Sequence, residues 1–124
     1  MVVGIGTDIV NIERIEHVYN KFGDDFIHKN FHKLEISYLS TLSHAAKIGY
    51  LAKRFAAKEA VAKALGIGIG CGLAFKDIAI VNNDSGAPQV LISSTIYPSI
   101  DEYNIHISLS DDHPFAVAFV TVSK

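Results

Sequence analysis

The run RFAAKEAVAKALG, residues 54–66, constrains the fold most, because it consists almost entirely of strong helix formers and ends in a glycine. Ile48 and Leu51 extend its apolar spacing upstream, so we expect one helix that begins at Ser43 or His44 and ends at Gly66. Alanines cover much of the remaining surface. A helix with so few polar sides belongs at the centre of a domain or at a subunit contact.

The flanking segments predict a sheet on which this helix packs. Apolar and β-branched runs indicate strands at residues 2–10, 75–81, 89–92, 105–110 and 115–122. We expect the first strand to be covered on both faces and the last to be central, with the later strands forming an antiparallel meander. The 124 residues therefore predict one α+β domain, residues 1–124, with a long central helix packed on a mainly antiparallel sheet.

Shorter helices are expected before the long one. Apolar residues within 12–22 recur at helical spacing, with Asn11 as a cap and Gly23 as a stop. Between residues 26 and 42, the spacing favours one further short helix that begins near His32.

Composition restricts the class of partner. The formal net charge of −2 argues against strong electrostatic binding of nucleic acid or membranes. The sequence has no secretory leader, and no apolar run approaches the ~20 residues that a membrane-spanning helix needs. The single cysteine, Cys71, excludes an intrachain disulfide, and we interpret it as a packing residue. We therefore expect a cytoplasmic protein.

Asp8 is the first candidate for chemistry, because a carboxylate towards the end of an apolar strand is costly to bury without a partner. Gly4 and Gly6 would let a neighbouring backbone or a ligand approach this strand closely. The plainer alternatives are that Asp8 caps the next helix or is simply exposed.

Glu59 is the second candidate, because it lies about 40° around the helix from Phe55, within the apolar sector. Lys63 follows one turn later, and the two side chains would form an ordinary helix pair worth roughly 0.2–0.5 kcal/mol. A buried, ionised glutamate needs more compensation than such a pair provides, and a metal cation would supply it.

Basic and polar side chains indicate where an anion would bind. Lys47, Arg54 and Lys58 fall on nearly one line of the helix, which is either a solvated face or a phosphate-binding edge. Alternation places His106 and Ser108 on one face of their strand, which is either simply solvent-facing or a source of donors to an anion. With two carboxylates and a glycine-rich loop after the helix, these residues fit a Mg²⁺–phosphate site.

The sequence contains three distinctive stretches in order: GIGTDIVNIERI, then RFAAKEAVAKALGIGIG with FKDIAI, and finally HISLSDD with FAVAFV. In combination they resemble the bacterial holo-acyl-carrier-protein synthases, which are small 4′-phosphopantetheinyl transferases. The resemblance implies Mg²⁺-dependent transfer of 4′-phosphopantetheine from coenzyme A to a serine of apo-acyl carrier protein. That reaction releases adenosine 3′,5′-bisphosphate and supports fatty acid biosynthesis. The resemblance also implies the family's fold and a homotrimer with active sites between subunits.

The same resemblance assigns roles to individual residues. Asp8 and Glu59 would bind Mg²⁺, while Lys63 would contact the pyrophosphate and stabilise charge on the leaving phosphate. The serine proton would leave through Glu59 or a metal-bound water. The positions that would bind coenzyme A are Arg54, Lys58, Lys63, Gly66, His106 and Ser108. Arg14 matches a position that meets the acidic carrier protein.

Three residues depart from the family pattern: Lys29 stands where an arginine is usual, His32 where a threonine is usual, and Asp111 where many relatives have a histidine. Lysine keeps the charge of arginine but not its planar fork. Two rival functions follow from the residues alone. One is a non-catalytic module that binds coenzyme A or a nucleotide, and the other is a structural trimer joined through the apolar helix.

Overall fold

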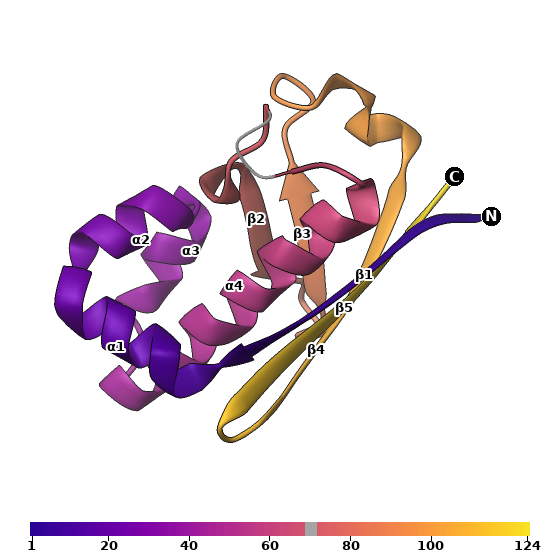
Figure 1. The fold of residues 1–124 in the computed structure, drawn as a ribbon. Coiled ribbons are helices and arrows are strands. Elements are labelled where there is room, and N and C mark those ends of the chain that lie inside the picture. Colours follow the sequence, from indigo (N-terminus) through magenta and orange to yellow (C-terminus); the bar gives the residue numbers. More distant parts are fainter. Residues whose placement is uncertain (69–71) are drawn as a thin grey trace.

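The computed structural model describes residues 1–68 and 72–124. Its elements, in chain order, are β1 (Val2–Asn11), α1 (Ile12–Phe22), α2 (Asp24–Asn30), α3 (Lys33–Leu39), α4 (His44–Leu65), the 3₁₀ helix η1 (Phe75–Asp77), β2 (Ile78–Asn82), β3 (Pro88–Ile92), the 3₁₀ helix η2 (Pro98–Glu102), β4 (Asn104–Asp112) and β5 (Phe115–Ser123). Helix α4 runs along the three-stranded sheet, and α1–α3 gather around its N-terminal half (Figure 1). The predicted α+β architecture is confirmed.

The strands form two sheets rather than the single meander that we predicted. β5 lies between β1 and β4, and both pairs are antiparallel, which confirms the prediction of a central last strand. β2 and β3 form a separate antiparallel hairpin. The connection between β3 and β4 contains a 3₁₀ helix that begins at Pro98, and these two strands share no ladder.

The inner face of β1 contacts α4 backbone to backbone. A Cβ atom added at Gly4 would lie 2.0 Å from the carbonyl oxygen of Ala64, and one added at Gly6 would lie 2.0 Å from that of Ala60. Only glycine permits this approach, so both glycines serve the contact between strand and helix.

The outer face of the main sheet is apolar and exposed. Ile5 and Ile9 on β1 are 65% and 61% exposed, and Phe115 and Phe119 on β5 are 45% and 48% exposed. The prediction that β1 is covered on both faces is therefore wrong for the single chain. Apolar residues on both sides of a strand do not say whether the second cover comes from the same chain.

The helix ends follow the predicted capping residues. The side chain of Asn11 accepts from the N–H of Glu13 at 2.9 Å to cap α1, and Ser43 caps α4. Gly66 ends α4 at a φ of +70°, a conformation that favours glycine. The helix expected to begin near His32 is confirmed as α3, which His32 caps, whereas α2 before it was not predicted.

No helix among residues 1–68 and 72–124 is both long and apolar enough to cross a membrane. Cys71, predicted to be a packing residue, lies outside the described residues.

Candidate active site

Asp8 and Glu59 face a common space between β1 and α4. Asp8 lies on the same face of β1 as Gly6, and Glu59 directly precedes Ala60, whose carbonyl oxygen Gly6 approaches. Glu59 is partly exposed rather than buried. Burial raises the pKa of Glu59, the Asp8 charge raises it further, and Lys63 lowers it. The two carboxylates are therefore close enough to repel each other.

Lys63 joins this pair from the next turn of α4. Its ammonium donates to Asp8 Oδ1 at 3.2 Å and to the carbonyl oxygen of Thr7 at 2.9 Å. The ion pair thus crosses the contact between helix and strand. The Lys63 side chain is 54% exposed and that of Asp8 only 17%, so the lysine has room to move towards a ligand.

The charges of this site are unbalanced, with two carboxylates against one ammonium. The described ranges contain no cluster of three or more His, Cys, Asp or Glu side chains that would hold a metal. Mg²⁺ commonly binds proteins through only one or two carboxylates and completes its octahedron with water and phosphate oxygens. The donor set of Asp8 and Glu59 fits that ion.

Lys47, Arg54 and Lys58 do not form a solvated face, because two of the three side chains are buried. Lys58 is fully buried, and its ammonium donates to Glu35 Oε1 at 2.6 Å. Arg54 is 6% exposed, and its guanidinium lies over the Tyr50 ring, 4.1 Å from the centroid. Arg54 and Lys58 therefore point into the molecule, and Lys58 is not available to bind a coenzyme phosphate in this structure.

Within the described residues, the guanidinium of Arg54 does not use all of its hydrogen-bond donors. Its Nη2 donates to Asn82 Oδ1 at 3.0 Å, whereas its Nε is buried without a hydrogen-bond partner in the part of the chain that the structure describes. The next residue, Asn83, lines a cavity of about 460 Å³ together with His106. Arg54 is therefore linked through Asn82 to a residue that lines the same cavity as His106.

His106 and Ser108 are not close to the two carboxylates within one chain. Both are exposed on the outer face of β4, which confirms the predicted alternation. Ser108 aligns with Phe119, which aligns with Thr7 on β1, so all three belong to the outer face. Asp8 is on the inner face, and the sheet separates it from both residues.

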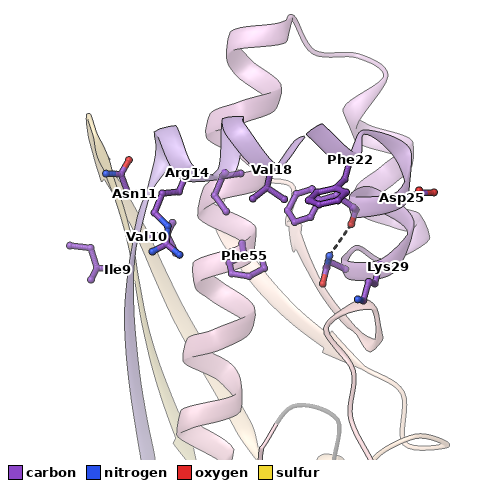
Figure 2. A pocket seen from close by; sticks show the side chains of 12 residues that line it. Ile9, Val10, Asn11, Arg14, Val18, Phe22, Asp25, Lys29 and Phe55 are labelled. Atoms are coloured by element: carbon purple, nitrogen blue, oxygen red, sulfur yellow. Dashed lines mark hydrogen bonds between the residues drawn. The ribbon is translucent and has the colours of Figure 1, made fainter. Parts of the chain in front are cut away.

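Arg14 lines an apolar cavity of about 530 Å³ between β1, α1, α2 and α4. Figure 2 shows Arg14 and Lys29 at this cavity with the apolar side chains of Val18, Phe22 and Phe55. Lys29, one of the three departures, is thus placed beside the predicted partner-binding residue.

The other two residues that depart from the family pattern, His32 and Asp111, make contacts within the chain. His32 caps α3, with its Nδ1 accepting from the N–H of Leu34 at 3.1 Å. Asp111 forms an ion pair of 3.4 Å with Lys53 on α4.

Sequence reasoning missed Glu35, which is fully buried on α3. Glutamate three residues after the cap His32 is the pattern of a capping box, and the structure contains that box. The pattern identifies the helix start, but it gives no signal of the distant lysine that shares the carboxylate.

Comparison with known proteins supports the predicted family. The profile of the 4′-phosphopantetheinyl transferase superfamily matches residues 4–119. A holo-[acyl-carrier-protein] synthase of Orientia tsutsugamushi is 46% identical over 128 residues, which cover 99% of this chain and 98% of the relative.

Solved structures agree with this assignment. The holo-[acyl-carrier-protein] synthase of Neisseria meningitidis has a TM-score of 0.90 and 35% identity, with 100% of both chains covered. The Bacillus anthracis enzyme, solved in complex with coenzyme A (3′,5′-ADP), has a TM-score of 0.85 and 37% identity, with 98% of this chain and 96% of that chain covered. The chain therefore belongs to the 4′-phosphopantetheinyl transferase superfamily, as its motifs predicted.

Proposed function

We propose that this protein is a cytoplasmic holo-[acyl-carrier-protein] synthase of fatty acid biosynthesis, which transfers 4′-phosphopantetheine from coenzyme A to a serine of apo-acyl carrier protein. The observation that carries the proposal is the convergence of Asp8 and Glu59, with Lys63 beside them, at the contact of β1 and α4. The name of the Orientia relative and the coenzyme complex of the Bacillus structure support the same substrates.

Asp8 and Glu59 would hold Mg²⁺, and the bound ion would supply positive charge to the pyrophosphate of coenzyme A. Lys63 would exchange its contact with Asp8 for a phosphate oxygen and stabilise charge on the departing phosphate. The carrier's serine oxygen forms a bond to the β-phosphorus as the bond to the 3′,5′-ADP oxygen breaks. The serine proton passes to Glu59 or to solvent.

We further propose that the active protein is a homotrimer. The exposed apolar outer face of the sheet, which includes Ile5 and Phe119, supports burial against another copy. His106 and Ser108 lie on that same face, away from the carboxylates of their own chain. In the trimer, they would complete a neighbour's site. Arg54 would contribute its guanidinium to the coenzyme's phosphates, and Gly66 would allow close approach of coenzyme A.

The Arg14 cavity is the proposed docking site for the carrier protein. Arg14 and Lys29 would attract the acidic carrier, and the apolar walls would accept its apolar side chains.

Intact-mass spectrometry of apo-acyl carrier protein tests the function directly. After incubation with enzyme, coenzyme A and Mg²⁺, the carrier should gain the mass of phosphopantetheine, and a chelator should prevent the gain. A coenzyme-binding module would instead show a thermal shift with coenzyme A while the carrier mass stayed unchanged.

A further inference from the structure

We propose that Glu35 and Lys58 form a buried pair that positions Glu59 for metal binding. This inference rests on the proposed function of the site. It assigns a role to two fully buried charged residues that are not among the predicted metal ligands.

The Glu35 carboxylate connects three elements. Oε1 accepts from Lys58 Nζ on α4 at 2.6 Å and from the N–H of His32, at the start of α3, at 2.9 Å. Oε2 accepts from the N–H of Ile80 on β2 at 3.1 Å. Each oxygen therefore has a donor, and together they tie α3 and β2 to the middle of α4.

Lys58 uses its remaining donors on two further backbone groups. Its ammonium donates to the carbonyl oxygen of Phe75 at 3.0 Å and to that of Ile78. The ring of Phe31 lies below it, with its centroid 5.4 Å from the ammonium. Three acceptors in fixed directions match the three donors of an ammonium, so the geometry is directional and not merely apolar filling.

This network acts on the helix residue that directly precedes Glu59. Consecutive side chains on a helix diverge by about 100°, so fixing the direction of Lys58 also fixes the rotation of α4 and the direction of Glu59. On another side of the same turn, Gly6 contacts the carbonyl of Ala60 and fixes the distance from β1. The network and the glycine contact together determine where Glu59 lies relative to Asp8.

A purely stabilising role would not require these charges, because well-packed apolar residues of similar volume commonly stabilise as much as a buried ion pair. Loss of residues that orient metal ligands typically reduces metal affinity or activity by about 10–100-fold. Metal affinity therefore separates a positioning role from a structural one.

The test uses the double variant Glu35→Gln with Lys58→Met, which leaves no unpaired buried charge. We expect it to fold and to need at least about tenfold more Mg²⁺ for half-maximal transfer, with little change in KM for coenzyme A at saturating Mg²⁺. Electron paramagnetic resonance should show a matching loss of Mn²⁺ affinity. Ile48→Val, a core change on α4 away from the network, is the control and should keep the wild-type metal requirement.

A folded double variant with the wild-type requirement for Mg²⁺ and wild-type Mn²⁺ affinity would overturn the proposal. If the double variant does not fold, Glu35→Met with Lys58→Met decides between the same two outcomes, because it replaces both charges by apolar side chains of similar volume. A wild-type enzyme that transfers nothing would refute the proposed function instead, and the Mn²⁺ titration would still decide whether the pair positions Glu59.

Discussion

Lys58 and Glu59 are consecutive residues of α4 in opposite electrostatic surroundings. Burial lowers the pKa of Lys58, but the adjacent Glu35 carboxylate raises it, and three acceptors surround the ammonium. Burial raises the pKa of Glu59, and Asp8 adds repulsion of like charge. The charge of Lys58 is compensated within the chain, while the charge of Glu59 is not. The comparison favours the pair of Asp8 and Glu59 as the place where a cation from solution would bind.

Breaking the compensated pair should have the largest effect. Lys58→Met alone leaves the Glu35 carboxylate buried without a counter-charge, and we expect the free energy of unfolding to fall by about 3–5 kcal/mol. Urea denaturation measures this loss. The double variant with Glu35→Gln should recover much of it, and equal stability of the single variant and wild type would show that the pair is not coupled.

Removing the uncompensated charge should separate activity from stability. Glu59→Gln should reduce transfer by at least about a hundredfold, because one of the two proposed carboxylate ligands is lost. A raised folded-state pKa means that Glu59 stabilises the fold below its unfolded pKa, and that this contribution is lost as pH rises through the folded value. At neutral pH without metal, the variant should therefore be at least as stable as wild type. Urea denaturation with a chelator present measures the direction of this change in stability. A variant less stable than the wild type would contradict the prediction.

Arg14 is a second charged residue that is available to a binding partner, here the proposed carrier protein. Arg14→Glu should weaken carrier binding by about tenfold or more through repulsion of an acidic partner, with coenzyme A affinity unchanged. Calorimetric titration with each ligand measures both values. Equal weakening of the two would show that the cavity does not discriminate between them.

The His32 cap of α3, next to the buried pair of Glu35 and Lys58, should contribute least to the free energy of unfolding. His32→Ala removes the side-chain acceptor for the N–H of Leu34 and should cost about 1 kcal/mol of unfolding free energy. His32→Thr restores an oxygen acceptor and should recover most of the loss in the same denaturation experiment. Equal stability of His32→Ala and the wild type would show that the imidazole cap is dispensable.

The sequence predicted the long helix well because its signals are local. Strong helix formers, Ser43 at the start and Gly66 at the end define α4 with little help from the rest of the chain. Helix α2 was missed, since it spans only seven residues and offers too few turns for periodicity.

The direction of individual side chains on α4 was harder to predict. Alanines cover most of the helix, so its pattern does not reveal which sides meet the core, and Lys58 was assigned to the surface although it is buried. Its partner Glu35 belongs to another element, and no local pattern connects them. The meeting of Asp8 with Glu59 was likewise expected from family resemblance and not from spacing.

The most direct test of the metal site is a crystal of the protein grown with coenzyme A and Mn²⁺ in place of Mg²⁺. We predict an anomalous difference peak bonded to carboxylate oxygens of both Asp8 and Glu59 and to a phosphate oxygen of the coenzyme. A peak elsewhere, or the two carboxylates turned apart with coenzyme A bound, would contradict the account.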